Sequence, residues 1–317
     1  MVKMSDTEWK KEYVINRRLL RSSEAETLKK THFPLMLYKY RSCCDNYALE
    51  NFDNDTIWMN TAANFNDPFD SCFSYSLDDI IEDAIGKDAF EYVISKNGIA
   101  GIELTEDEIY ALRHRPYKEM IKYLLEKNSG YLALFEQICD RHMQCIWSPD
   151  YQERALSHIR DLQECLSVCC FSETPGSILM WSHYADYHKG FCLGYDFRDT
   201  ELQSEFEPVI YSEDMYDATS VILGDISNIN PFWMKYTAMR KHIDWAYERE
   251  WRLIKFAWEQ DNSKYALSIP QPKVIYLGCK IDERNKDKLI DAAKAKSMEI
   301  YQMKMDEKKF MLNPIKI

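Results

Sequence analysis

Apolar and polar residues follow two different periods along the chain, and the change of period separates three regions. Short apolar and β-branched runs, typical of strands, occur before residue 61 and again after residue 165. The predicted strands cover residues 35–41, 56–60, 166–171, 191–197, 208–211, 247–255, 273–278, 299–303 and 310–317. Between the two groups, Leu77, Ile80 and Ala84 recur at helical spacing. We therefore predict an α+β fold, in which a mixed, mostly antiparallel sheet carries a helical insertion at 77–163.

Helix start signals support this division. Ser5 and Glu8 have the spacing of a capping box before an amphipathic N-terminal helix, which we expect within residues 1–34. Thr105 and Glu108 repeat the spacing, and Pro116 suits the first turn of another helix. Further helical patterns cover residues 131–146, 151–163, 231–242 and 282–297. We expect all these elements to form a single domain spanning residues 1–317.

The stretch 169–196 holds the densest cluster of aromatic residues, histidines and small hydroxyls. Its pattern predicts a strand, a turn, a short helix and a second strand. Ser177 can cap the helix, and Gly190 is the residue type that ends a helix in the left-handed conformation.

Four side chains of this helix are candidates for ligand contacts. Trp181, Tyr184 and His188 share one face, which is either an aromatic core face or a ligand-stacking surface. His183 lies roughly 140° around the axis from His188, since the two are five residues apart. A shared metal ion prefers spacing i, i+4, so we predict no metal site here.

Two further segments carry polar residues that could face a cleft. Asn66 and Asp67 lie in a turn, where they either point into a cleft or satisfy backbone groups. On the late strand, Glu248, Glu250 and Arg252 should face one way. Such carboxylates beside an arginine suit acid–base catalysis, and the alternative is a solvated face with cross-strand ion pairs.

Composition limits the classes of function. A net charge of −12 disfavours nucleic-acid binding by charge alone. A nuclease is disfavoured by this charge and by the lack of a metal-ligand cluster in the sequence. The N-terminus lacks the apolar core of a signal peptide, and no apolar run is long enough to span a bilayer. We therefore expect a cytoplasmic protein without a membrane partner. The ten cysteines lack CxxC spacing, which favours reduced, structural thiols over metal ligation.

Arg41, Ser172 and Glu250 lie in this order on three predicted strands, which resembles the R-S-E pattern of ADP-ribosyltransferases. The sequence Glu248-Arg249-Glu250 also resembles the ExE element of that superfamily, although a clear STS triplet is missing. The resemblance implies that the arginine binds the phosphates of NAD and that the serine supports the nicotinamide ribose. It also implies that the glutamate stabilises an oxocarbenium-like transition state. Aromatic side chains could form the nicotinamide slot, namely Tyr38, Tyr40, Trp181 and Tyr184.

An ordered series of motifs resembles an uncharacterised bacterial family of unknown function. The series is NDPFD at 66–70, CFSE at 170–173, MWSHYA at 180–185, HKGFC at 188–192 and EREWR at 248–252. This resemblance implies no activity. A loose association of such proteins with phage-defence loci suggests a role in phage defence.

Together these patterns predict one cleft. Its expected lining is Tyr38, Arg41, Asn66, Asp67, Ser172, Trp181, His183, Tyr184, His188 and Glu250, with Glu248 as the alternative catalytic carboxylate. The leading hypothesis is an ADP-ribosyltransferase or glycohydrolase that uses NAD as its substrate. The alternative is a non-catalytic sensor module that recognises a nucleotide or a peptide.

Overall fold

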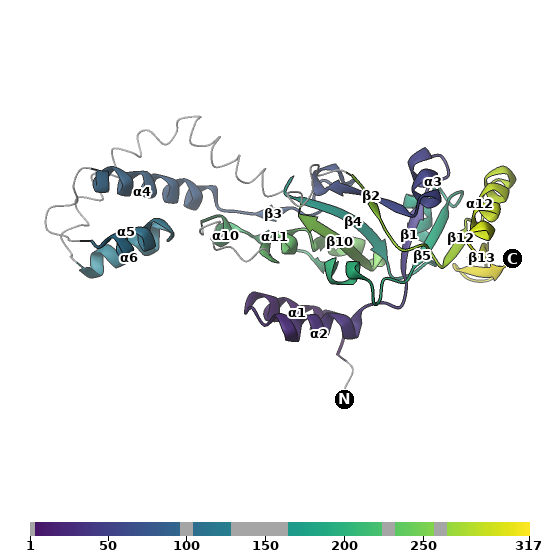
Figure 1. Ribbon diagram of the computed structural model, residues 1–317, viewed down its shortest axis with the longest axis horizontal. Helices are drawn as coiled ribbons and strands as arrows, with labels where there is room; N and C mark the ends of the chain where they lie inside the picture. The colour runs from purple at the N-terminus through teal and green to yellow at the C-terminus, as the bar shows by residue number, and fades with distance from the viewer. Residues whose placement is uncertain (1–3, 96–103, 128–163, 224–231, 257–264) are drawn as a thin grey trace. The chain divides into compact units, whose positions relative to one another are not determined.

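The computed structural model describes residues 4–95, 104–127, 164–223, 232–256 and 265–317. The chain divides into two compact units (Figure 1). The first unit comprises Met1–Cys72, Glu164–Asp214 and Met234–Ile317, and the second comprises Phe73–Gln163 and Met215–Trp233. The second unit thus includes the expected insertion together with a later segment that the sequence pattern did not assign to it.

A ten-stranded sheet forms the body of the first unit. Its strands are β1 (Leu37–Arg41), β2 (Thr56–Thr61), β4 (Leu166–Ser172), β5 (Phe191–Tyr195), β6 (Phe206–Pro208), β10 (Glu250–Phe256), β11 (Tyr265–Ser268), β12 (Val274–Leu277), β13 (Glu299–Met305) and β14 (Leu312–Lys316). The main order is β11-β2-β4-β1-β5-β12-β13-β14, and β10 pairs with both β4 and β6. Only the β12–β13 pair of this sheet is parallel among the described strands. The prediction of an α+β fold with a mixed, mostly antiparallel sheet is confirmed.

Strand β4 pairs with one strand along one of its edges and with two different strands along the other. Along one edge it pairs with β10 over its full length, from Ser172 opposite Glu250 to Leu166 opposite Phe256. Along the other edge, Ser172 pairs with Tyr38 of β1, whereas Val168 and Ser167 pair with β2. Strands β1 and β2 therefore separate along β4, and the middle of β4 faces the space between them.

Aromatic side chains pack the core beneath β4, β6 and β10. The Phe171 ring meets the Phe197 and Phe206 rings edge to face, with centroids 5.3 and 5.4 Å away. Trp251 is fully buried, and the Trp9 ring stacks on it at 6.0 Å. These contacts hold the N-terminal region against the sheet.

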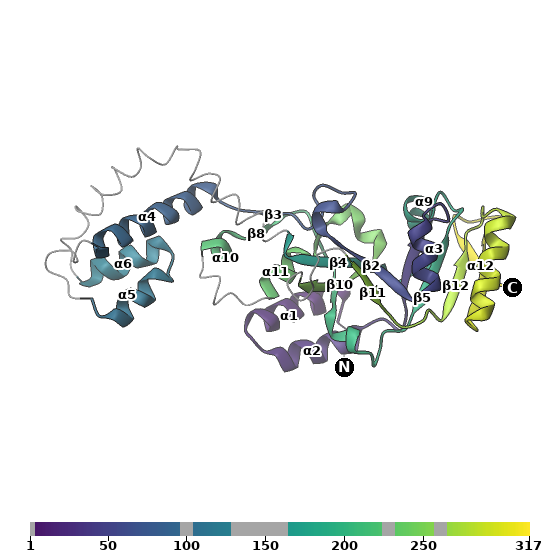
Figure 2. The same ribbon diagram turned by 45° about the horizontal axis from the view of Figure 1, so that its top comes forward.

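The N-terminal region forms two helices rather than the one predicted within residues 1–34. They are α1 (Asp6–Arg18) and α2 (Ser22–His32), which lie side by side (Figure 2). The predicted capping box of Ser5 and Glu8 is present. The chain turns at Leu20, whose φ of 57° is incompatible with a continuous right-handed helix. The Tyr13 hydroxyl of α1 donates to the buried Glu207 carboxylate at 2.5 Å.

Helix α9 (Ile178–Tyr184) follows its Ser177 cap but ends earlier than predicted. Residues Asp186, Tyr187 and His188 all have positive φ, so the chain leaves the helix before it reaches Gly190. Gly190 serves close packing instead, because an added Cβ would lie 2.1 Å from the Arg41 carbonyl oxygen. The other α-helices of this unit include α3 (Asn46–Asp53) and α12 (Glu283–Ala295).

Two predictions around residues 231–255 need correction. The predicted helix over 231–242 divides into α11 (Phe232–Thr237) and β9 (Arg240–His242), and β9 pairs in parallel with β7 (Ile210–Ser212). The predicted strand over 247–255 begins only at Glu250, after the 3-10 helix η4 (Ile243–Glu248). Arg249 joins η4 to β10 in the left-handed conformation, with φ 48° and ψ 58°.

The described residues of the second unit form helices and one small parallel pair of strands. Its elements are β3 (Phe73–Ser74), α4 (Leu77–Ser95), α5 (Glu106–Arg113), α6 (Tyr117–Lys127), β8 (Tyr216–Asp217) and α10 (Thr219–Leu223). The capping box at Thr105 and the helix after Pro116 are as predicted. The helices predicted over 131–146 and 151–163 lie outside the described residues. Across the described segments, no helix combines the length and apolar character needed to cross a membrane.

Candidate functional site

A cavity of about 260 Å³ lies where β1 and β2 separate along β4. Its lining comes from β1, β2, β4, α9, β9, η4, β10 and the turn after β2, all within the first unit. The lining residues are Tyr38, Lys39, Tyr40, Arg41, Trp58, Asn60, Phe65, Asn66, Asp70, Val168, Cys169, Cys170, Met180, Tyr184, Lys241, Glu248 and Glu250. Lys39 donates from Nζ to the Cys170 carbonyl oxygen at 2.7 Å and so satisfies a backbone group on the open part of β4.

Five charged side chains form a buried cluster at one wall of this cavity. They are Asp70, Lys241, Glu248, Glu250 and Arg252, and none of them exposes more than 7% of its surface. Three carboxylates thus share two cations in a setting from which most water is excluded. Such a cluster is favourable only when its members satisfy one another, because each buried charge loses its hydration.

Arg252 holds two of the carboxylates. Its two terminal nitrogens donate to the two oxygens of Asp70, both at 2.7 Å, and its Nε donates to Glu250 at 2.8 Å. Glu250 and Arg252 face the same side of β10, as residues two apart on a strand should. The expected alternative of a solvated face is wrong, because the Arg252 side chain is fully buried.

Lys241 connects all three carboxylates. Its Nζ lies 2.6 Å from Glu248, 3.0 Å from Glu250 and 3.2 Å from Asp70. Burial disfavours the charged amine, but the surrounding carboxylates, above all Glu250, outweigh this effect and raise the pKa of Lys241. The lysine is therefore a fixed positive charge at the cavity wall.

Glu248 and Glu250 differ in their environments although they are only two residues apart. Burial and the neighbouring Glu250 carboxylate raise the pKa of Glu248 to about 7, against the opposing effects of Lys241 and Tyr184. For Glu250, burial is outweighed by Arg252 and Lys241, which hold its pKa well below the usual value. One carboxylate therefore stays ionised, while the other changes its protonation near neutral pH.

Tyr184 and Arg41 complete the polar side of the cavity. The Tyr184 hydroxyl donates to Glu248 Oε1 at 2.7 Å, which fixes the carboxylate toward the cavity. Arg41 lines the same cavity, and no carboxylate of the described residues forms an ion pair with it. Its guanidinium is thus available to a phosphate or carboxylate of a ligand.

The structure brings six of the sequence-predicted site residues to this cavity. They are Tyr38, Arg41, Asn66, Tyr184, Glu248 and Glu250. Five others do not line it, namely Asp67, Ser172, Trp181, His183 and His188.

Ser172 and Asp67 have structural contacts instead. The buried Ser172 hydroxyl donates to the Glu248 carbonyl oxygen at 2.6 Å and so anchors the junction between η4 and β10. The Asp67 carboxylate accepts from the Phe69 backbone N–H at 2.9 Å, which is the turn alternative considered for this residue.

The aromatic residues of α9 are divided between core and surface. Trp181 is fully buried, donates to the Pro175 carbonyl at 2.7 Å and packs against Tyr40, which is the core-face alternative. His183 is exposed near the rings of Trp245 and Tyr247. His188 lies 3.0 Å from the Ser182 hydroxyl and lines a different cavity.

Sequence reasoning missed Asp70 and Lys241 as site residues. Lys241 lay in a segment predicted to be a helix, and only the assignment of β9 as a strand places it opposite the carboxylates. Asp70 was visible only as the last residue of a motif, without a partner to indicate its role. Within the segments that the structure describes, no group of three or more histidine, cysteine or acidic side chains is arranged to hold a metal ion.

Residues 180–253 match a family described as "Protein of unknown function (DUF2971)". The match includes Tyr184, Lys241, Glu248 and Glu250 but not Arg41. It supports a relation of this part of the chain to an uncharacterised family. A search of curated proteins and a search of solved structures give no match to the chain.

Proposed function

We propose that the cavity binds NAD and that the protein cleaves the bond between nicotinamide and ribose, passing ADP-ribose to water or to an acceptor. The observation that carries this proposal is the convergence of Glu248 and Arg41 on one cavity. Glu248 is a carboxyl group whose pKa of about 7 suits acid–base work at neutral pH. Arg41 is a cation free to bind a phosphate.

The proposal assigns the catalytic role to Glu248 rather than to Glu250. Glu250 accepts three hydrogen bonds from cationic nitrogens, two from Arg252 and one from Lys241. Glu248 accepts only one such bond, from Lys241, and a second from the neutral Tyr184 hydroxyl, so it keeps more capacity for a substrate hydroxyl. In its ionised form, Glu248 would stabilise the positive charge that develops on the ribose, or take a proton from the attacking water or acceptor. Lys241 and Tyr184 would orient it.

The size of the cavity fits part of NAD. Cavities that enclose a whole ligand of this kind usually measure about 300–1,000 Å³, and this cavity measures about 260 Å³. The nicotinamide riboside would therefore lie inside, between Tyr38 and Tyr184, with Arg41 at the diphosphate and the adenosine outside.

One observation favours a non-catalytic alternative. The cluster around Arg252 is so fully paired that it could serve as a rigid wall of a recognition site. In that case the cavity would bind a nucleotide without turnover, as a sensor would.

The first experiment incubates the purified protein with NAD and follows the release of nicotinamide by chromatography, with a thermal-shift assay for binding. We expect release by the wild-type chain and a loss of about 10²- to 10⁴-fold in kcat for Glu248→Gln. Arg41→Gln should mainly raise KM. The control is Glu299→Gln, since Glu299 is exposed and pairs only at the surface with Lys316.

Three outcomes would count against this function or its assignment. The proposal is overturned if the wild-type chain shows no nicotinamide release and no thermal shift with NAD. A thermal shift that depends on Arg41 without any release would favour the sensor alternative. Full activity in Glu248→Gln together with an inactive, folded Glu250→Gln would move the catalytic role to Glu250.

A further inference from the structure

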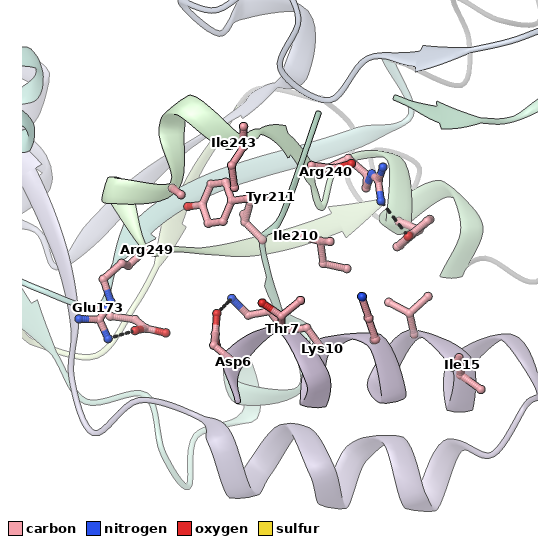
Figure 3. A pocket seen from close by; sticks show the side chains of 16 residues that line it. Asp6, Thr7, Lys10, Ile15, Glu173, Ile210, Tyr211, Arg240, Ile243 and Arg249 are labelled. Atoms are coloured by element: carbon pink, nitrogen blue, oxygen red, sulfur yellow. Dashed lines mark hydrogen bonds and ion pairs between the residues drawn. The ribbon is translucent and has the colours of Figure 1, made fainter. Parts of the chain in front are cut away.

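A second and larger cavity lies between α1 and the segment from β7 to η4, in the first unit. Its volume is about 680 Å³, and it shares no lining residue with the cavity around Glu248. Figure 3 shows Thr7 and Lys10 of α1 facing Ile210 and Tyr211 across this groove. The lining is Asp6, Thr7, Lys10, Lys11, Val14, Ile15, Glu173, Val209, Ile210, Tyr211, Ser212, Tyr236, Arg240, Ile243, Ala246 and Arg249.

The charges of the groove do not balance. Lys10 pairs with Asp6 at 2.8 Å, and Arg249 pairs with Glu173 at 2.7 Å, so both acidic residues of the lining are neutralised. Lys11 remains, together with Arg240, and among the described residues neither forms an ion pair with a carboxylate. The lining residues thus carry four positive and two negative charges, in a chain whose net charge is −12. Glu8, outside the lining, interacts with Lys11 only at longer range than an ion pair.

Arg240 is held in place with part of its guanidinium unused. One terminal nitrogen donates to the Asp214 carbonyl at 2.6 Å, and the other lies 3.3 Å from the Tyr236 hydroxyl. Its Nε is buried and has no hydrogen-bond partner in the described part of the chain. The guanidinium therefore keeps an unneutralised positive charge beside the groove, and a phosphate oxygen of a ligand would pair with that charge.

The other walls of the groove suit a flat, apolar body. Tyr211 is fixed because its hydroxyl oxygen accepts from the Glu250 backbone N–H at 2.9 Å, and Tyr236 lies beside Arg240. Val14, Ile210 and Ile243 add aliphatic surface. A volume of about 680 Å³ lies within the range of about 300–1,000 Å³ that encloses small-molecule ligands.

We propose that this groove is a second ligand site, which binds a nucleoside phosphate with its phosphate on Arg240 and Lys11 and its base against Tyr211. Arginine is the side chain best matched to phosphate oxygens, and tyrosine rings stack readily on a planar base. The proposal does not depend on cleavage of NAD, because the residues that carry it are distinct from those around Glu248.

The test titrates ADP into the full chain at low salt and measures heat of binding. We expect Arg240→Gln and Lys11→Gln each to weaken ADP binding by about tenfold, as expected for loss of a charge-assisted hydrogen bond. Lys11 is exposed, so its variant keeps the proposal testable if Arg240→Gln fails to fold. Adenosine, which lacks the phosphate, and inorganic phosphate, which lacks the base, should both bind more weakly than ADP.

Two control variants separate this groove from other sites. Arg198→Gln removes an exposed arginine that pairs with Asp196 and should leave ADP binding unchanged. Arg41→Gln removes the phosphate-binding cation of the cavity around Glu248, so a titration of this variant reports the groove alone, and ADP binding that depends on Arg240 and Lys11 should remain. The proposal is overturned if the wild-type chain does not bind ADP, or if adenosine binds as tightly as ADP. It is equally overturned if Arg41→Gln abolishes ADP binding while Arg240→Gln and Lys11→Gln do not affect it.

Discussion

At the scale of single residues, burial decides the chemistry of the two neighbouring glutamates. Both lose most of their hydration, which favours the neutral carboxyl group. Arg252 compensates Glu250 directly, whereas Glu248 shares Lys241 with two other carboxylates. The two residues therefore have opposite pKa shifts although they are chemically identical and two positions apart.

This difference predicts how stability depends on pH. The pKa of Glu248 is about 7 in the folded chain and near 4.5 when unfolded, so folding is favoured while Glu248 is protonated. Its contribution is fully present below the unfolded pKa and is lost as pH rises through about 7. Between about pH 5 and pH 8, the wild-type chain should lose about 1–3 kcal/mol of stability relative to Glu248→Gln. Urea unfolding of both chains across this range measures the difference.

The control for this experiment is Glu299→Gln. Hydrogen bonds from Lys316 and Tyr301, together with the charge of Lys316, lower the pKa of Glu299. Glu299 therefore stays ionised across this pH range, and its substitution should not change how stability depends on pH there. If the free energies of unfolding of the wild type and of Glu248→Gln change in parallel with pH, this would contradict the raised pKa of Glu248.

At the scale of elements, the pattern of apolar residues predicted most strands of the sheet and most helices, but it predicted neither the edge strand β11 nor the helix α3. β4 and β5 are buried almost throughout, and their apolar runs carry a strong strand signal. The pattern failed where tertiary contacts override local preference. The tight η4–β10 junction needs a left-handed Arg249, and Ser172 stabilises it from a strand 76 positions earlier. Such long-range contacts leave no periodic signal in the sequence.

The sequence likewise predicted some residues of the candidate site and missed others. Glu248, Glu250 and Tyr184 could be found because their motifs combine unusual residue types at short spacing. Lys241 and Asp70 could not, because their roles depend on three segments that converge only in the folded sheet. Trp181 was ambiguous from sequence, since a core aromatic face and a stacking surface have the same helical period.

The turn after α9 gives a prediction at this scale. A Cβ at position 190 would lie 2.1 Å from the Arg41 carbonyl oxygen and 3.0 Å from the Ala185 backbone, so β1 or the turn must move. We expect Gly190→Ala to destabilise the chain by about 2–3 kcal/mol, as overpacking does. It should also weaken NAD binding, because Arg41 would be displaced.

Gly176→Ala is the matched control in the same region. Its added Cβ would meet only the Thr174 Oγ1 at 3.7 Å, an ordinary contact, so we expect a change within about 0.5 kcal/mol. Urea midpoints of the two variants give the comparison, and equal midpoints would contradict the close packing at Gly190.

At the scale of the whole molecule, both candidate ligand sites belong to the first unit. Every lining residue of either cavity falls within Met1–Cys72, Glu164–Asp214 or Met234–Ile317. The second unit has apolar clusters of its own, one around Phe90 and Met120 and another around Phe73 and Ile80. A separate core is what allows a segment to fold without its neighbour.

This division predicts that the second unit can be removed without loss of the two sites. In the variant, Gly/Ser linkers of about 12 residues replace 73–163 and 215–233, since such linkers span roughly 20 Å. If the first unit folds alone, ADP affinity and any nicotinamide release should stay within about threefold of the full chain. Glu248→Gln and Arg240→Gln should have the same effects in both backgrounds.

Circular dichroism shows whether the shortened chain is folded. A folded variant that binds neither ADP nor NAD would mean that the second unit contributes to ligand binding. If the shortened chain binds ADP and NAD but releases no nicotinamide, the second unit takes part in turnover but not in binding. The charged residues of the first unit would then be sufficient to hold the ligand but not to cleave it.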